Sequence, residues 1–212
     1  MIPLPPVILA GRHVRLEPLA LRHLPALVAA ASGRRDTFRL TTTPDGEPQA
    51  REYLTAALDA QAAGGALPFA IVSLALGRVV GSTRFGNLER WTWPKGHASA
   101  RTDGAPDAGE IGWTWLAEEA QRTAVNTEAK RLMLAHAFET WQFHRITLKT
   151  DVRNTRSRAA IERLGARFDG VLRAHFPAVD GTLRDSATYS ILAAEWPSVR
   201  ASLDARLLVA TG

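Results

Sequence analysis

The stretch EIGWTWLAEEAQRTAVNTEAKRLMLAHAFETWQFHRITLKTDVRNTRSRAAIERLGA, residues 110–166, decides the fold of this 212-residue chain. Its pattern predicts a strand over 110–116, a helix over 125–141, a strand over 145–151 and a short helix over 154–164. Two strands of one sheet that are joined through a helix must be parallel. The two helix beginnings should therefore lie near each other, where their free N–H groups favour an anion such as phosphate.

Segments on both sides of this stretch add further strands and helices. The predicted strands cover 13–19, 69–76, 79–85, 167–176 and 183–193, and the predicted helices cover 21–31, 47–63 and 196–208. The sequence therefore predicts an α/β fold of the mixed α+β kind, as a single domain over 1–212. Its central mixed, mostly antiparallel sheet would contain one parallel βαβ crossover and carry flanking helices.

Two segments of the chain show no regular pattern. Residues 86–109 are rich in Trp, Pro, Gly, Ser and Asp without a period. A loop of this length in a compact domain is usually functional or flexible, and we expect it near the acceptor site, with a disordered insertion as the alternative. Residues 205–212 are expected to form a flexible tail.

Composition narrows the classes of function. The chain has no cysteine, which excludes disulfides, thiolate metal sites and a cysteine nucleophile, and fits the cytoplasmic location that we expect. No His/Asp/Glu cluster has metal-ligand spacing, so no metal is expected. No apolar run reaches the ~18 residues of a membrane span. The net charge of +5 indicates an anionic partner or a solvated basic surface, and the scattered arginines argue against nucleic acid.

The strand over 110–116 should present two different faces. Alternation puts Glu110, Gly112, Thr114 and Leu116 on one face, and Ile111, Trp113 and Trp115 on the other. The first face is small and polar, as expected for a face that lines a substrate. A β-bulge within the strand would break this alternation.

Polar residues open both predicted helices. Asn126 and Thr127 stand near the start of the first helix, and Asn154 and Ser157 open the second. Plain N-capping explains these residue types. Two such helix starts on consecutive βα units nevertheless favour a ligand with several phosphates.

Three segments carry a resemblance to a known family: EIGWTW (110–115), TEAKRLMLAHAFE (127–139) and RNTRSRAAIERLGA (153–166). They resemble the GNAT superfamily of acetyl-CoA-dependent N-acyltransferases, in the branch of the ribosomal-protein N-terminal acetyltransferases RimJ and RimL. The resemblance extends from GRHVRLEPL (11–19) to RDSATYSILAAEW (184–196).

This resemblance implies direct transfer of an acetyl group from acetyl-CoA to a primary amine in a ternary complex. A protein N-terminus, a lysine, a polyamine and an aminated antibiotic all stay open as acceptors. A non-catalytic relative that binds acyl-CoA or a nucleotide is the alternative. The oligomeric state is equally open, with a homodimer as one option.

The resemblance also implies the cofactor contacts. In the family, a loop of the form Gln/Arg-x-x-Gly-x-Gly/Ala holds the CoA pyrophosphate; Gln121 matches its first position, while the small positions fall on Ala124 and Asn126. The expected pyrophosphate contacts are Gln121, Arg122, Thr123, Ala124, Val125, Asn126 and Thr127. Further expected cofactor contacts are Trp113, Trp115, Asn154, Ser157 and Arg158.

Catalytic roles follow from the same comparison. An attacking amine must lose a proton, and Glu110 matches the glutamate that begins this strand in the RimL-like branch. We expect Glu110 to be the general base, with a structural ion pair as the alternative and with Asp107, Glu118 and Glu119 as weaker rivals. Asn154 would bind the pantetheine arm. Ser157, or a water, would protonate the departing thiolate, because Ile161 stands where many relatives have a tyrosine.

The acceptor pocket is expected to involve five residues: Arg84, Trp91, Trp93, His175 and Tyr189. Ordinary packing is the alternative for Tyr189, Trp91 and Trp93, and it is the stronger alternative for Tyr189. A backbone N–H of the 110–116 strand is expected to polarise the acetyl carbonyl.

Overall fold

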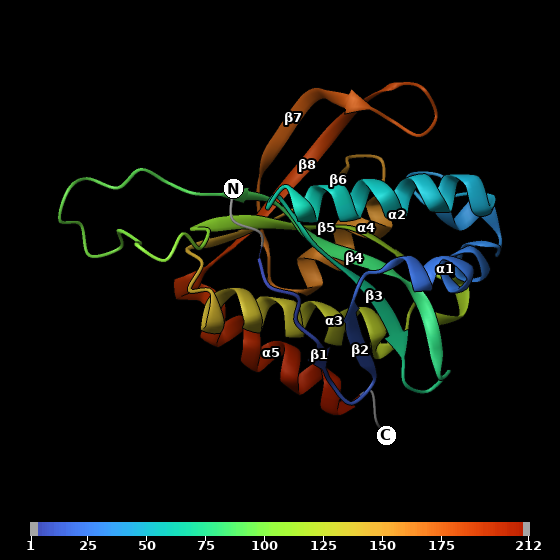
Figure 1. Cartoon of the computed structure of the whole chain (residues 1–212), viewed down its shortest axis with the longest axis horizontal. Helices are drawn as coiled ribbons and strands as arrows, with labels where there is room; N and C mark the ends of the chain where they lie inside the picture. Colours follow the sequence, from blue (N-terminus) through green and yellow to red (C-terminus); the bar gives the residue numbers. More distant parts are fainter. Residues whose placement is uncertain (1–3, 210–212) are drawn as a thin grey trace.

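One mixed sheet forms the centre of the protein. The computed structural model describes residues 4–209, and its eight strands lie in the order β1-β2-β3-β4-β5-β6-β8-β7 (Figure 1). The strands are β1 (Leu9–Ala10), β2 (Val14–Pro18), β3 (Leu67–Ser73), β4 (Arg78–Glu89), β5 (Ala108–Leu116), β6 (Arg145–Asp151), β7 (Arg167–Pro177) and β8 (Leu183–Leu192). Every neighbouring pair is antiparallel except β5 and β6. The predicted fold class, with its parallel crossover, is confirmed.

Helices cover the sheet on both sides. They are α1 (Leu24–Ala31), α2 (Gly46–Ala62), α3 (Ala124–Ala135), α4 (Thr155–Arg163) and α5 (Trp196–Val209). Short helical turns add η1 (Leu21–His23), η2 (Arg35–Phe38), η3 (Glu118–Ala120), η4 (His136–Thr140) and η5 (Ala193–Glu195). In Figure 1, α1 and α2 lie on one side of the sheet, while α3 and α5 lie on the other. Among the described residues, no helix is long and apolar enough to cross a membrane.

Helix α3 is packed on two sides. It contacts β2 and α5, and its residues Ala129, Met133 and Leu134 are fully buried. A helix with apolar residues on two faces needs cover on both, which explains its place between the sheet and α5. The continuation η4 has π-helical geometry, so the helix predicted over 125–141 is present with a wider last turn.

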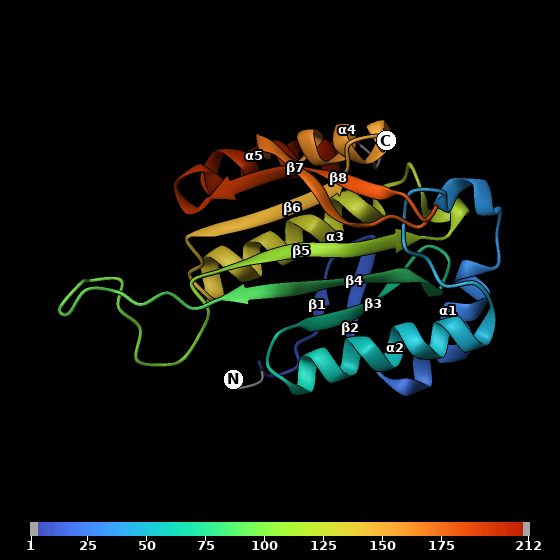
Figure 2. The ribbon, with the colours of Figure 1, turned by 90° about the horizontal axis from the view of Figure 1, so that it is seen from above.

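The parallel pairing of β5 with β6 is short. It joins Ala108 to Arg145, Gly109 to Ile146 and Glu110 to Thr147, and beyond Glu110 the two strands are no longer paired (Figure 2). The helix starts that follow these strands lie close together, because Arg156 Nη1 in α4 donates to Gln121 Oε1 before α3, at 3.4 Å. The predicted neighbourhood of the two helix starts is therefore present.

A bulge in β5 corrects the predicted alternation. Arg84 pairs with Gly112 and Ser82 pairs with Trp115, so three steps on β5 match two steps on β4. Trp113 is the extra residue of the bulge, and its backbone is in the left-handed region, at φ 51°. The prediction that Thr114 shares the face of Glu110, opposite Trp113 and Trp115, is therefore wrong beyond Gly112.

Contacts on the two sides of the sheet confirm the new assignment. Thr114 faces α3, where its hydroxyl accepts a hydrogen bond from Lys130 Nζ. Trp115 faces α2, where its ring lies edge-on to Tyr53 at 6.3 Å. Arg84 lies on the same side as Tyr53. The next residue, Phe85, points to the α3 side, where its ring packs on Trp141 at 4.7 Å. Glu110, Trp113 and Trp115 thus share the face that α2 covers.

The irregular segments differ in extent from the predicted ones. Strand β4 continues to Glu89 and β5 begins at Ala108, so the long loop covers 90–107 rather than 86–109. Figures 1 and 2 show this loop projecting beyond the end of the sheet. Helix α5 continues to Val209 and so occupies much of the range expected as a tail; residues 210–212 lie outside the described part.

Candidate active site

Three strands place polar groups around the carboxylate of Glu110. The residue is 8% exposed, and it lies at the last paired position of β5 and β6. Its Oε2 accepts a hydrogen bond from Asn87 Nδ2 in β4 at 2.9 Å and lies 3.0 Å from Lys149 Nζ in β6. The ion pair considered as the alternative for Glu110 is therefore present. Both bonds end on Oε2, which leaves Oε1 for another partner.

Two glycines leave room on this face of the sheet. A Cβ on Gly112 would lie 3.0 Å from Glu110 Oε1, and a Cβ on Gly86 would lie 2.5 Å from the indole of Trp113. The carboxylate of Glu110 and the indole of Trp113 therefore lie directly against glycine backbone. A larger residue at Gly112 or Gly86 would displace them. This close approach fixes where Glu110 and Trp113 can sit.

His175 belongs to the same face. Its Nδ1 lies 3.0 Å from the hydroxyl of Ser186 across the β7–β8 hairpin. Burial lowers the pKa of His175, the charges of Lys149 and Arg184 lower it further, and Glu110 partly opposes them. The imidazole is therefore neutral at pH 7. The structure brings His175 into the electrostatic reach of Glu110.

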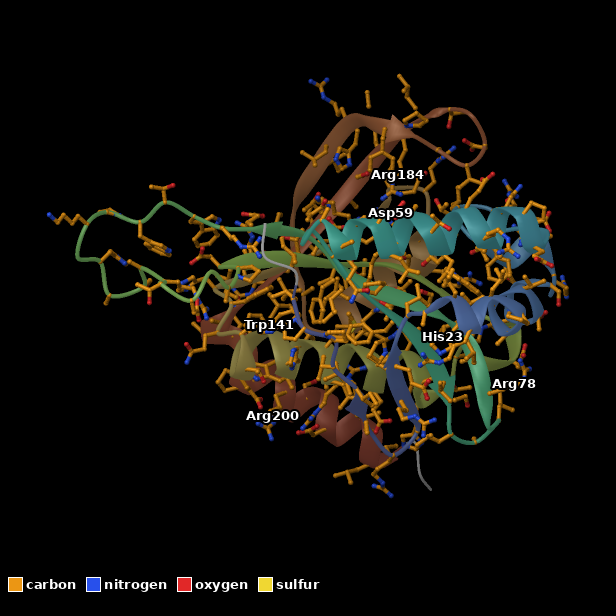
Figure 3. All side chains as sticks on the ribbon, viewed as in Figure 1. His23, Asp59, Arg78, Trp141, Arg184 and Arg200 are labelled. Carbon is orange, nitrogen blue, oxygen red and sulfur yellow. The ribbon has the colours of Figure 1, made fainter. Side chains whose placement is uncertain are left out.

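Arg184 adds a second cation from the same hairpin. Its Nε donates to Ser186 Oγ at 3.0 Å, and burial lowers its pKa while Asp151 and Glu110 raise it. Figure 3 shows Arg184 extending from β8 on the side of the sheet that carries α2. Arg184, like Asn87 and Lys149, was missed in the sequence, because only the pairing of strands far apart in the chain brings these residues to Glu110.

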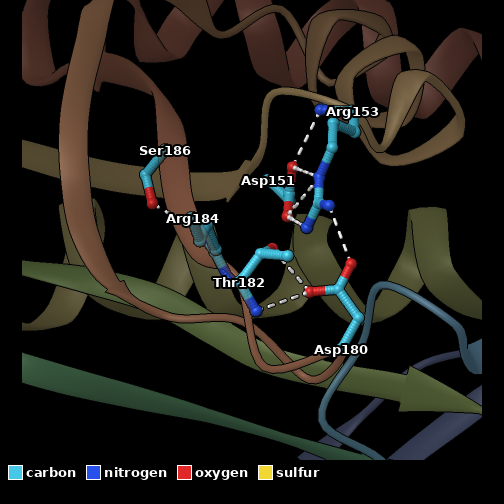
Figure 4. Close-up of polar contacts among 6 residues, drawn as sticks. All are labelled: Asp151, Arg153, Asp180, Thr182, Arg184 and Ser186. Atoms are coloured by element: carbon cyan, nitrogen blue, oxygen red, sulfur yellow. Dashed lines mark hydrogen bonds and ion pairs between the residues drawn. The ribbon is translucent and has the colours of Figure 1, made fainter.

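A salt-bridge pair holds the tip of the hairpin in place. Arg153, just after β6, contacts Asp151 and Asp180 at 2.7 Å each (Figure 4). Asp180 also accepts hydrogen bonds from the backbone N–H and hydroxyl of Thr182. The β7–β8 turn is therefore tied to the end of β6.

The loop before α3 has the features of an anion site. Thr123 caps the helix, and its hydroxyl accepts the N–H of Val125 at 3.3 Å. Gln121 Nε2 donates to Leu116 O at 2.9 Å, and Arg122 is left-handed at φ 62°. Val125 is buried, so only its backbone faces the loop.

The two positions that depart from the family loop lie inside α3. Ala124 and Asn126 have no positive φ, so neither needs glycine for its backbone conformation. The backbone N–H groups of Ala124, Asn126 and Thr127 lie in the first turn of the helix and point toward its open end. Asn126 Oδ1 is buried without a partner among the described residues. This helix start can hold a pyrophosphate.

The start of α4 shows the expected capping. Asn154 Oδ1 accepts the N–H of Ser157 at 3.0 Å, so the capping alternative is confirmed for the side-chain oxygen. Its amide nitrogen stays available for a ligand. Arg158 Nε, in contrast, donates to the hydroxyl of Tyr189 at 2.9 Å.

Several predicted residues lie away from Glu110. Tyr189 is fully buried on the α4 side of the sheet, where its hydroxyl donates to Glu162 at 3.1 Å. Trp115 is 3% exposed and packs into the core. Trp91 and Trp93 pack at the base of the loop, where Asp107 accepts from both. The structure does not bring these residues together with Glu110.

Lys130 supports the bulge from the opposite face. Its Nζ, fully buried in α3, donates to Thr83 Oγ1 at 2.8 Å and to Thr114 Oγ1 at 2.6 Å. The two hydroxyls are 2.8 Å apart and join β4 to β5 beside Trp113. Burial lowers the pKa of Lys130 to about 7. Sequence patterns could not identify this role, because an isolated lysine in a helix usually faces solvent.

Replacing Lys130 with methionine should change how stability depends on pH. In the folded state the pKa of Lys130 is about 7, below its ordinary 10.5, so the unfolded chain binds more protons between these values. The stability of the wild type should therefore rise with pH across that window. The destabilisation caused by the charge of buried Lys130 is fully present below pH 7. We expect Lys130→Met to be more stable than wild type at pH 6 by about 2 kcal/mol, with the difference shrinking toward pH 10.

Urea unfolding at several pH values measures this effect. Lys95→Met is the matched control, because Lys95 is exposed in the long loop and its substitution should leave the pH dependence unchanged. Parallel stability curves for wild type and Lys130→Met would contradict the assignment.

Comparison with known proteins agrees with the geometry. The family model of the acetyltransferase (GNAT) domain matches residues 13–167. The curated protein named "Putative ribosomal N-acetyltransferase YdaF", from Bacillus subtilis (strain 168), is 36% identical over 87 residues. That match covers 41% of this chain and 46% of YdaF, less than half of the curated relative.

Solved structures match over nearly the whole chain. A GCN5-related N-acetyltransferase from Brucella melitensis is 29% identical with a TM-score of 0.79, covering 97% of this chain and 87% of its own. Mycobacterium smegmatis RimJ in complex with CoA-disulfide is 25% identical with a TM-score of 0.72, covering 96% and 93%. The family match spans well over half of the residues, and the chain therefore belongs to the GNAT acetyltransferase family.

Proposed function

We propose that this protein transfers an acetyl group from acetyl-CoA to a primary amine in a ternary complex. The observation that carries the proposal is the position of Glu110. Its carboxylate lies where β5 and β6 stop pairing, beside the bulge, with Oε1 facing the open side of Gly112. Acetyl-CoA supplies the activated acetyl thioester. The protein has to bind this thioester, orient it and accept a proton.

Residues at the open end of the β5–β6 pair fit the phosphates of CoA. The start of α3 offers backbone N–H groups and the positive end of the helix dipole. Arg122 and Arg156 add positive charge beside it, and both are exposed. The pantetheine arm would lie along the unpaired backbone of β5, near the amide of Asn154.

Chemistry would take place at the bulge. The left-handed turn at Trp113 re-aims the backbone N–H groups of β5, and one of them would donate to the acetyl carbonyl oxygen. Glu110 Oε1 would take the proton of the attacking amine, directly or through a water. Lys149 and Asn87 hold the carboxylate in place through Oε2. Ser157, or a water, would protonate the departing thiolate.

The alternative of a non-catalytic relative was motivated by the altered pyrophosphate loop. Because Ala124 and Asn126 both have ordinary helical backbone angles, the substitutions do not prevent the helix start from forming. We therefore favour the catalytic function.

Binding of acetyl-CoA is the first test. The wild-type protein should be stabilised by acetyl-CoA in a thermal-shift assay, and it should release free thiol when an amine is added. Ala124→Glu should abolish the shift, because a carboxylate in the first turn repels phosphate while it suits the helix dipole and keeps the helix folded. Ala56→Glu, on the exposed side of α2, is the matched control and should retain it. A wild-type protein that acetyl-CoA does not stabilise would refute the proposal.

A further inference from the structure

Arg84 is a buried cation on the face of Glu110. It lies in β4 opposite Gly112, while Glu110 lies opposite Gly86 in the same pair of strands. Arg84 is only 8% exposed. The side chain is therefore buried on the face of the sheet that carries Glu110, and is not part of the solvated surface.

Aromatic rings surround the guanidinium, and no acidic partner does. Its central carbon lies 4.5 Å from the ring centre of Trp113 and 5.4 Å from that of Tyr53. Its Nε is buried without a hydrogen-bond partner among residues 4–209. Glu110, which lies on the same face, is already paired with Lys149 and Asn87.

Two partly buried arginines in other parts of the fold form salt bridges. Arg131 contacts Asp204 at 2.8 Å, and Arg101 contacts Asp103 at 2.8 Å. Arg84 instead forms no salt bridge with any described carboxylate. Cation–π contact and the neighbouring hydroxyl of Tyr53 offset part of its desolvation, but the N–H of Nε still has no acceptor within residues 4–209.

Loss of a proton does not remove the buried charge of a guanidinium. Burial lowers the pKa of Arg84, yet arginine stays charged at every physiological pH. A buried charge without an oppositely charged partner is destabilising, and perturbed charged groups of this kind are concentrated at functional sites. The ligand groups that match a planar, multi-donor guanidinium are carboxylate and phosphate.

We propose that Arg84 binds a carboxylate of the acceptor, and that the acceptors are therefore small amino-carboxylates. This inference rests on the proposed function, because it places the acceptor amine at Glu110. Gly112 and Glu110 are two residues apart on one strand before the bulge, which is roughly 7 Å. That spacing suits an amine and a carboxylate separated by a few bonds. The phosphates of CoA do not compete for Arg84, because the helix start that suits them lies beyond the bulge.

Matched amines test the inference. Glycine and 4-aminobutyrate should be acetylated with a kcat/KM roughly 10- to 100-fold above glycinamide and 4-aminobutanamide, the effect of one charge-assisted pair. In Arg84→Met the ratio of acid to amide should fall to about one, and Arg84→Lys should restore part of it. Arg15→Gln, an exposed arginine in β2, is the matched control and should keep the wild-type ratio.

A binding assay separates this inference from the proposed function. With CoA present, N-acetylglycine should raise the thermal unfolding temperature of the wild type more than N-acetylglycinamide does, and Arg84→Met should lose the difference. Arg84→Met itself should unfold at the same temperature as the wild type or higher, because it removes an unpaired buried charge. The acid-specific thermal shift could occur, and be lost in Arg84→Met, while no amine is acetylated. That result would support the carboxylate site at Arg84 and refute the proposed acetyl transfer.

Two results would overturn the inference. One is equal kcat/KM values and equal thermal shifts for acids and amides in the wild type. The other is an Arg84→Met variant whose acid-to-amide ratio is unchanged while its KM for acetyl-CoA rises, which would assign Arg84 to the cofactor.

Discussion

Replacing Glu110 with glutamine is expected to lower kcat at pH 7 by roughly 10²- to 10⁴-fold, the usual contribution of a general base. Glutamine keeps the shape and the contact with Asn87, but its amide cannot accept a proton from the attacking amine. The dissociation constant of acetyl-CoA should stay within about two-fold, because the helix starts that suit CoA are not altered. Steady-state kinetics and a thermal-shift titration measure the two quantities.

The pH profile identifies the role. Amines lose their proton at high pH without help, so the deficit of Glu110→Gln should be largest near pH 7 and should decrease as pH rises. Glu52→Gln, exposed on α2, serves as the matched control. A deficit of equal size across the pH range would instead indicate that Glu110 only pairs with Lys149.

Replacing Glu128 with glutamine should destabilise the protein by about 3 kcal/mol or more. Glu128 lies in α3 and is 5% exposed. Its carboxylate accepts three backbone N–H groups, from Arg12 at 2.9 Å, His13 at 2.6 Å and Val14 at 2.8 Å. A glutamine would turn an NH₂ group toward at least one of these donors, leaving buried donors without acceptors.

Thermal and urea unfolding measure this loss. For a chain of this size, 3 kcal/mol corresponds to a fall of about 10 °C in the unfolding temperature. Glu47→Gln is the matched control: Glu47 forms an exposed ion pair with Arg51, worth less than about 0.5 kcal/mol. Unfolding temperatures that agree for the two variants would show that the three bonds contribute little.

The order of elements could be predicted from the sequence because it depends on local patterns. The β5–α3–β6–α4 unit follows from alternation, helical spacing and polar helix starts. Glu110 and Gly112 could be placed on one face of the sheet because both precede the bulge. Both predicted uses of Asn154, as a cap and as a ligand contact, depend on the same helix start, and the structure shows the cap.

The remaining features depend on distant parts of the chain. The bulge at Trp113 arises from the mismatch of β4 and β5, which no single strand reveals. Glu128 meets partners more than a hundred residues earlier. Tyr189 was expected at the acceptor pocket but is fully buried on the other face of the sheet. Its neighbour Thr188 pairs with Lys149 and shares the face of Glu110, so Tyr189, one residue further along β8, points toward α4.

The distribution of lysines has a consequence for chemical labelling. The chain has three lysines. Lys130 is enclosed beneath the bulge, and Lys149 is held by Glu110. Lys95, in the projecting loop, is the exposed one within the described residues. Among the lysines, amine-reactive dyes or resins should therefore attach at Lys95, so the protein can be immobilised or given a fluorophore there without modifying Lys149 beside Glu110.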